Sequence, residues 1–143
     1  MLSRKFVVFF MATALLACTV TTITPAQNQA TSVDAQIRDL ITQKRDVLKE
    51  RLDGTQRLHE VGGTQKDRVL IARIDLLRTE LDLATSKAER IVVLESQLKT
   101  RRELEQWLKR RYKDGTDSFD AQFVATADRL DAEIALLREK AKP

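Results

Sequence analysis

The apolar residues of this 143-residue chain recur three and four positions apart from Val33 to the C-terminus. That spacing places them along one face of an α-helix, whereas a half-buried β-strand needs strict alternation. The chain has only four glycines and two prolines, and aromatic residues make up 5% of it. Too few turn-forming and sheet-forming residues remain for a β-sandwich or a βαβ fold. The sequence therefore predicts an all-α protein.

Local turn signals divide the periodic region into about four helices. The Gly-Gly pair that begins at Gly62 predicts the end of the first helix, and Thr64 is predicted to start the second. Ser86 opens an S-x-x-E capping box, which favours a new helix over one that runs straight through. Gly115 forms the last turn, and Ser118 is expected to cap the last helix. We expect two αα-hairpins that form an antiparallel helical bundle or an elongated coiled coil.

The two hairpins form an internal repeat at a shift of 53 residues, which aligns Gly62 with Gly115. Both hairpins then carry an apolar stripe in the same heptad register, the pattern by which helices pack side by side. Neither hairpin can bury its stripe alone, so the two are expected to pack together or against a partner chain. The residues predicted to carry this packing seam are Leu70, Ile74, Leu77, Leu81, Phe123, Ala127, Leu130, Ile134 and Leu137. An aspartate at Leu77 or Leu130 is accordingly expected to abolish helicity, because it would bury a charge.

The first seventeen residues have the profile of a secretory signal peptide. Arg4 and Lys5 precede an uncharged apolar run, residues 6–17. Twelve helical residues rise only ~18 Å, too little to cross a hydrocarbon core of ~30 Å. A short basic start followed by an apolar core of this length is typical of export signals. We therefore expect the protein to be exported.

Cys18 is the only cysteine and directly follows the apolar run. Its context resembles the lipobox of bacterial lipoproteins, which implies a lipid anchor on Cys18, and the following Thr19 favours the outer membrane, facing the periplasm. The alternative is ordinary cleavage after Ala26, with Cys18 as one more small apolar residue of the signal. Residues 18–32 are rich in Thr and Gln and are predicted to form a flexible tether, which leaves 33–143 as the helical domain.

The second hairpin resembles the helical region of the outer-membrane efflux (TolC-like) family. In that family a helix ends in R-Y-x-x-G-x-x-S, with an apolar residue five positions after the Ser and an Ala seven after it. Those positions are occupied here by Arg111, Tyr112, Gly115, Ser118, Phe123 and Ala125. Ala121 stands where the family has an acidic residue. The resemblance spans about 33–141 and lacks the barrel strands, so it implies a hairpin module associated with an efflux assembly rather than a pore.

No motif indicates catalysis, a metal or a cofactor. His59 is the only histidine, has no cysteine near it, and is interpreted as a solvated residue near a helix end. The chain has no glycine-rich phosphate loop and no nucleophile motif. We therefore expect a protein that is not an enzyme and binds no cofactor.

The densest positive charge lies at Lys109, Arg110, Arg111 and Lys113. These cations either contact an anionic surface, such as lipid headgroups, peptidoglycan or an acidic partner, or simply complement the carboxyl end of a solvated helix. Loss of the signal peptide halves the net charge of +4, so the charge gives no indication of nucleic-acid binding.

The function expected from these features is that of a non-enzymatic envelope protein that acts through helix–helix interactions. Its expected partners are further copies of itself or other coiled-coil envelope proteins, with efflux components added by the resemblance. One alternative is a periplasmic chaperone or stress-binding protein that offers an apolar helical face to unfolded clients. Another is a module that binds the envelope surface through its basic cluster.

Overall fold

The computed structural model describes residues 25–143, and the predicted signal peptide with Cys18 lies outside them. The described residues form four α-helices and no strand. The helices are α1 (Pro25–Glu60), α2 (Lys66–Leu83), α3 (Lys87–Lys113) and α4 (Phe119–Ala141). The prediction of an all-α protein is confirmed.

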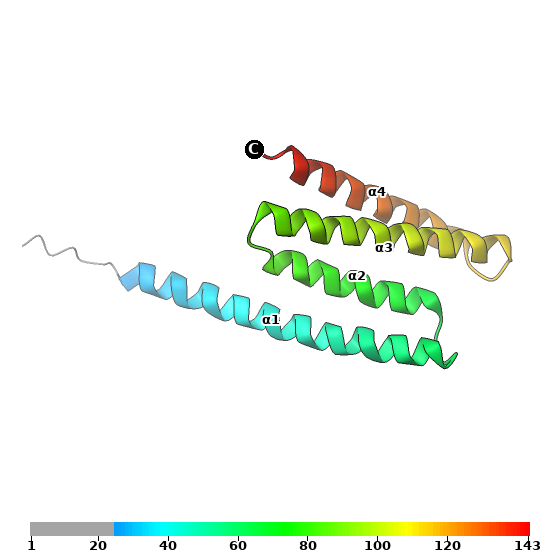
Figure 1. The fold of residues 1–143 in the computed structure, drawn as a ribbon, viewed down its shortest axis with the longest axis horizontal. Coiled ribbons are helices and arrows are strands. Elements are labelled where there is room, and N and C mark those ends of the chain that lie inside the picture. The colour runs from blue at the N-terminus through cyan, green and yellow to red at the C-terminus, as the bar shows by residue number, and fades with distance from the viewer. Residues whose placement is uncertain (1–24) are drawn as a thin grey trace, which may run out of the picture.

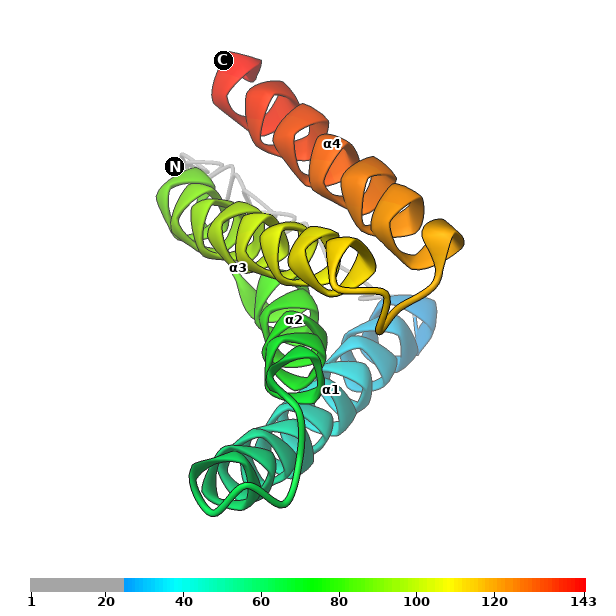
Figure 2. The same ribbon diagram turned by 90° about the vertical axis from the view of Figure 1, so that its right-hand side faces the viewer.

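The helices lie side by side in chain order, each running back along the one before it (Figure 1). α1 packs on α2, α2 on α3, and α3 on α4. Within the described residues α1 and α4 do not touch, so the row does not close into a ring of four helices (Figure 2). The inner helices α2 and α3 each have two packed sides, whereas α1 and α4 each have one.

α1 begins earlier than the apolar periodicity indicates. It includes residues 25–32, which we expected to belong to a flexible tether. Proline at the first helical position is well accommodated, because its missing N–H has no helical partner there. The alanines and glutamines that follow Pro25 have good helix propensity, although they provide no apolar stripe. Residues 18–24 of the expected tether lie outside the described part.

The two predicted glycine turns have the same geometry. Gly62 has φ 75° and Gly115 has φ 67°, a left-handed conformation that costs other residues energy because of the Cβ. In each turn the following residue donates its backbone N–H to a carbonyl in the last turn of the helix, at 2.7 Å for Gly63 and 2.9 Å for Thr116. Both helices therefore end in a Schellman motif, at equivalent places in the repeat.

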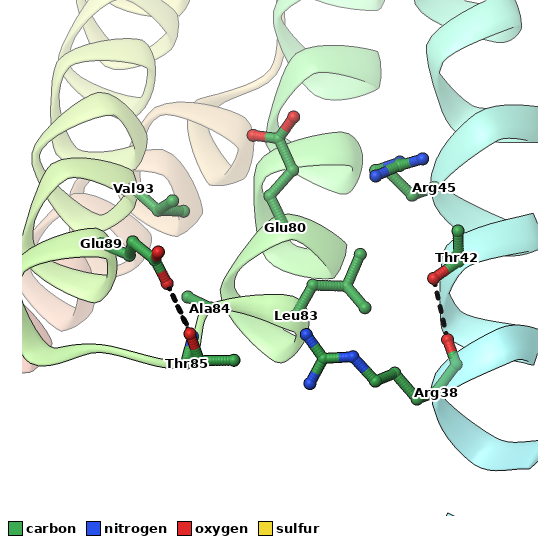
Figure 3. Close-up of a pocket in the computed structure, with 9 residues that line it drawn as sticks. All are labelled: Arg38, Thr42, Arg45, Glu80, Leu83, Ala84, Thr85, Glu89 and Val93. Atoms are coloured by element: carbon green, nitrogen blue, oxygen red, sulfur yellow. Dashed lines mark hydrogen bonds between the residues drawn. The ribbon is translucent and has the colours of Figure 1, made fainter. Parts of the chain in front are cut away.

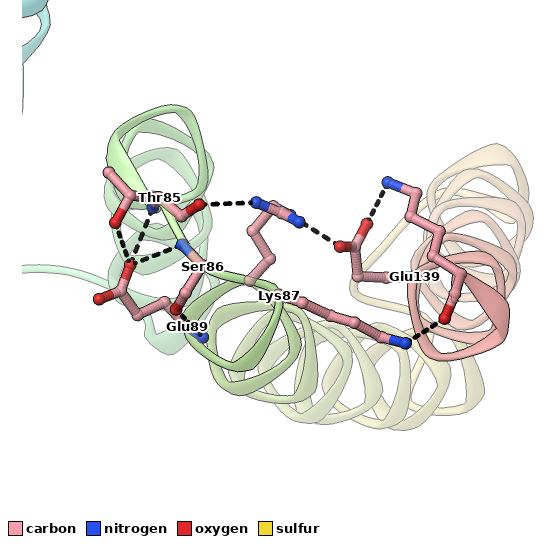
Figure 4. A network of polar contacts seen from close by, with 7 residues as sticks. Thr85, Ser86, Lys87, Glu89 and Glu139 are labelled. Atoms are coloured by element: carbon pink, nitrogen blue, oxygen red, sulfur yellow. Dashed lines mark hydrogen bonds and ion pairs between the residues drawn. The ribbon is translucent and has the colours of Figure 1, made fainter.

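The predicted helix starts are confirmed in two cases out of three. The Ser86 hydroxyl accepts the Glu89 N–H at 3.2 Å while the Glu89 carboxylate accepts the Ser86 N–H at 3.1 Å, which completes the capping box and separates α2 from α3 (Figure 4). Ser118 caps α4 by accepting a backbone N–H at 3.3 Å. The predicted start at Thr64 is wrong, because α2 begins at Lys66.

The core is thin and lies between neighbouring helices. Leu70 and Ile74 of α2 pack with Leu104 of α3. A second cluster joins α3 to α4 and consists of Leu94, Leu98, Ala132 and Leu136. Leu81 of α2 also packs against the second cluster, and neither cluster includes a residue from the outer side of α1 or α4.

Candidate helix-docking surface

α4 packs on α3 with a face of small residues. Ala125 and Ala132 are 4% and 6% exposed, and Leu136 is 7% exposed. Alanine brings the two helix backbones close together, and this face is the one that the sequence analysis missed. The repeat contains a signal that points to it, since the equivalent of Ala125 in the first hairpin is Ala72, which is fully buried.

The predicted seam of α4 lies on the solvent side. Phe123, Leu130, Ile134 and Leu137 are 44–62% exposed, and Ala127 is exposed as well. Within the described residues they do not pack between the two hairpins, and of the two expected contacts only the one with a partner chain remains for them. The physical reason is that α4 has two faces with helical spacing, and α3 packs on the face of smaller residues.

The predicted seam of α2 is placed differently. Leu70 and Ile74 are buried against α3. Leu77 is half-buried, and half-buried Leu81 packs against the cluster that joins α3 to α4. The repeat-equivalent stripes of α2 and α4 thus differ: the stripe is largely covered on the inner helix α2 and uncovered on the edge helix α4.

We call the uncovered residues of α4 the α4 stripe: Phe119, Phe123, Ala127, Leu130, Ile134 and Leu137. At its amino-terminal end the rings of Phe119 and Phe123 lie 4.5 Å apart, and the Tyr112 ring meets Phe119 edge-on at 5.9 Å. Uncovered apolar rows of this kind are typical of interaction sites. The heptad spacing of the α4 stripe is the one that a partner helix needs.

α1 carries a second uncovered stripe on the opposite edge of the row. We call it the α1 stripe: Val33, Ile37, Leu40, Val47 and Leu58, each 49–65% exposed. Lys44 and Arg51 interrupt it at stripe positions. The neighbouring apolar residues Ile41, Leu48 and Leu52 are half-buried, so α1 has a covered and an uncovered apolar side.

A polar network fixes how α4 sits on α3. The Glu105 carboxylate is 7% exposed and accepts hydrogen bonds from Thr126 at 2.9 Å, Arg129 at 3.1 Å and Lys109 at 2.7 Å. Burial acts to raise the pKa of Glu105, but the bonds from Lys109 and Thr126 outweigh it and hold that pKa below its usual value. Because Thr126 and Arg129 belong to α4, the network holds the α4 stripe away from α3.

A second network ties the far end of α4 to the α2–α3 turn (Figure 4). Arg90 donates to the Thr85 carbonyl at 3.2 Å and to the Glu139 carboxylate at 2.7 Å. Hydrogen bonds from Lys142 and Arg90 lower the pKa of Glu139. The pKa of Glu89 is lowered by the backbone N–H groups of Thr85 and Ser86. These contacts order the turn and the start of α3.

The predicted basic cluster is partly used by the fold. Lys109 belongs to the network between α3 and α4 described above. Arg111 lies 3.5 Å from Asp117 and donates to the Thr116 carbonyl at 2.9 Å. The Arg110 guanidinium lies over the Trp107 ring. Most of the clustered positive charges therefore have a structural role, because they stabilise the carboxyl end of α3.

A cleft of about 450 Å³ separates α1 from the end of α2 (Figure 3). Arg38 and Arg45 line it from α1, and Glu80 lines it from α2. Thr42 lies in the same wall but donates its hydroxyl to the Arg38 carbonyl at 2.9 Å, within its own helix. The cleft is open and holds opposite charges. On its α3 side the Thr85 hydroxyl donates to the Glu89 carboxylate at 3.0 Å, a contact that belongs to the start of α3.

His59 makes a local contact only. Its Nδ1 lies 2.9 Å from the Thr64 carbonyl oxygen, which keeps Thr64 in the turn ahead of α2. Among residues 25–143 no three His, Cys, Asp or Glu side chains are grouped as a metal site would require. Nor does any helix in that range have the length and apolar character needed to cross a membrane.

Comparisons of the chain with models of known protein families, with curated proteins and with solved structures find no match.

Proposed function

We propose that this chain is a non-enzymatic docking protein that binds partner helices through the α4 stripe. The observation that carries the proposal is the exposure of a heptad-spaced apolar row on a helix whose other side is already packed. Exposed apolar surface costs free energy in water, and a partner helix that covers it regains that energy. The rigid placement of α4 by the Glu105 network presents the row in one fixed orientation.

The proposal includes the cellular setting expected from the sequence. Residues 1–17 export the chain, Cys18 carries a lipid that anchors it at the outer membrane, and the helical domain faces the periplasm. The two αα-hairpins act as units of the internal repeat. The efflux-family resemblance of the second hairpin supports partners in an efflux assembly, and coiled-coil envelope proteins are the wider class.

The chaperone alternative draws on the same exposed residues, but it predicts a different kind of binding. An unfolded client can bind any apolar surface and needs no regular spacing of residues. The α4 stripe instead repeats with heptad spacing along its whole helix, which suits a partner helix. The surface-binding alternative is less well supported, because Lys109 and Arg111 already have carboxylate partners in the fold.

The proposal is tested with a photoreactive phenylalanine analogue placed at Leu137 in the full chain, irradiated in cells. Leu137 is 62% exposed on the α4 stripe, and Val92 is 63% exposed on α3 and serves as the matched position. We expect discrete adducts from Leu137 that map to apolar faces of partner helices, and few from Val92. Adding Ile134→Glu should remove the Leu137 adducts while leaving the far-UV circular dichroism unchanged.

Two outcomes would contradict the proposal. Equal adduct yields at Leu137 and Val92 would show that the stripe is no preferred contact. A broad smear of adducts with unfolded or nascent proteins would instead favour the chaperone alternative.

A further inference from the structure

The packed interface between α2 and α3 provides a template for what the edges of the row bind. Its α2 side contains Leu70 and Ile74, which pack with Leu104 of α3. Further along, Leu77 of α2 and Thr100 of α3 line one cleft. At the far end Ala84 and Val93 line another (Figure 3). The two helices run antiparallel along this whole interface (Figure 1).

The internal repeat maps the α2 side of this interface onto the α4 stripe. The shift that aligns Gly62 with Gly115 places Leu70, Ile74, Leu77 and Leu81 on Phe123, Ala127, Leu130 and Ile134. The shared turn geometry and the burial of both Ala72 and Ala125 show that the two helices sit equivalently on their hairpin partners. The α4 stripe is therefore the uncovered equivalent of a surface that α2 uses to bind α3.

The same shift maps the α3 side onto the α1 stripe. Val93 corresponds to Leu40, and Thr100 corresponds to Val47. Leu104 corresponds to Arg51, which pairs with Asp75 of its own chain, so the match is apolar at Leu40 and Val47 and polar at Arg51. Leu40 and Val47 are 63% and 65% exposed, although their equivalents on α3 face a neighbouring helix. The α4 edge of the row thus carries the equivalent of the α2 side of this interface, and the α1 edge carries the equivalent of the α3 side.

We infer that a second copy of this chain is a partner of the α4 stripe, and that it binds with its α1 stripe. The contact would reproduce the α2–α3 interface between molecules, with α4 and the α1 of the second copy antiparallel. This inference rests on the proposed docking function and names one occupant for it. In the register of the template, Leu130 lies opposite Val47 of the second copy, and Leu137 lies opposite Leu40 of the second copy.

Charges beside the two stripes match in this register. Asp120 falls opposite Arg57 of the second copy. Arg138 similarly falls near Asp39 of the second copy. All four side chains are exposed, and none forms an ion pair with another described residue of its own chain. Pairs of opposite sign set register and orientation in helix–helix contacts.

The contact is heterologous, because two different surfaces meet. Each added copy leaves one α1 stripe and one α4 stripe uncovered at the ends of the assembly. Head-to-tail contacts of this type continue into a row of copies or close into a ring. A two-fold dimer through α4 alone would instead leave both α1 stripes uncovered.

Cysteine crosslinking in the full chain distinguishes these arrangements. The variants are Leu40→Cys, Leu137→Cys and the double variant, treated in expressing cells with a short membrane-permeant bismaleimide. We expect a ladder of dimers, trimers and larger adducts from the double variant, identified by mass spectrometry as copies of this chain. Each single variant should match the parent, which has Cys18 as its only cysteine, and co-expression of the two single variants should give dimers only. Leu40→Cys with Val92→Cys is the matched control and should give no ladder.

A charge-exchange experiment tests the register. Asp120→Lys should lower the ladder yield about twofold to fivefold, the range that an exposed ion pair contributes. Adding Arg57→Asp should restore the parent yield. If Asp120→Lys leaves the yield unchanged, the register drawn from the α2–α3 template is overturned.

Other outcomes would overturn the inference. A strong dimer from Leu137→Cys alone would mean that α4 pairs with α4. Absence of a ladder from the double variant, together with adducts to other proteins from the photoreactive group at Leu137, would refute the second copy and leave the docking function intact. Absence of both signals would refute the two proposals together.

Discussion

At the scale of single residues, Glu105 links the packing of α4 to pH. Its folded pKa lies below the usual 4.5, because the bonds it accepts outweigh the effect of burial. A carboxylate whose pKa is lowered by folding stabilises the folded state above its unfolded pKa, and that contribution is lost as the pH falls through the folded pKa. We therefore expect the free energy of unfolding to decrease below about pH 4.5.

Glu105→Gln isolates this contribution. At pH 7 we expect the substitution to lower the free energy of unfolding by about 1–2 kcal/mol, because hydrogen bonds to a charged group are lost. The difference from the parent should shrink below pH 4.5, as measured by urea titrations at a series of pH values. Glu95→Gln is the control, since the Glu95–Lys140 pair is about half exposed and should contribute little. An undiminished difference at pH 3 would contradict the role of the carboxylate charge.

Glycines offer a second test at this scale, because they occur in opposite backbone contexts. Gly115 has φ 67°, so Gly115→Ala should destabilise the chain by about 1 kcal/mol. Gly54 lies inside α1, where the nearest atom to an added Cβ is an Arg57 nitrogen at 4.0 Å. Gly54→Ala should therefore stabilise the chain by up to about 1 kcal/mol. Chemical denaturation of both variants measures this, and shifts in the same direction would refute the argument.

At the scale of the helices, the sequence predicted what local chemistry decides. The capping box at Ser86, the cap at Ser118 and the turns at Gly62 and Gly115 depend on residues within a few positions of one another, so each could be read directly. The start of α1 at Pro25 was missed, because apolar periodicity was taken as the sign of a helix.

Periodicity alone could not predict which face of α4 packs on α3, because two faces of this helix carry small or apolar residues at helical spacing. The Ala125–Ala132–Leu136 face is less apolar than the α4 stripe, yet α3 binds it. The choice depends on Glu105 of α3, which takes Thr126 and Arg129 as partners. Contacts between distant segments thus decided which stripe became the core and which became the candidate site.

At the scale of the whole molecule, the open row separates residues that hold the fold from residues that remain for partners. α2 has helices on both sides, so Leu70 is 2% exposed, whereas α4 ends the row and Leu130 is 46% exposed. An aspartate at Leu70 must be buried without a partner, at a cost of several kcal/mol that a thin core does not recover. An aspartate at Leu130 stays in contact with water, so the earlier expectation that it abolishes helicity is corrected.

The two substitutions should therefore separate folding from association. Leu70→Asp is expected to lose most far-UV helicity at 25 °C, while Leu130→Asp keeps the parent spectrum and loses the crosslinked ladder. Circular dichroism of each full-length variant, with the crosslinking assay alongside, measures both effects. Loss of helicity in Leu130→Asp would place the α4 stripe in a core that a single chain needs. In that case the stripe would be part of an obligatory assembly, in which the copies fold only together.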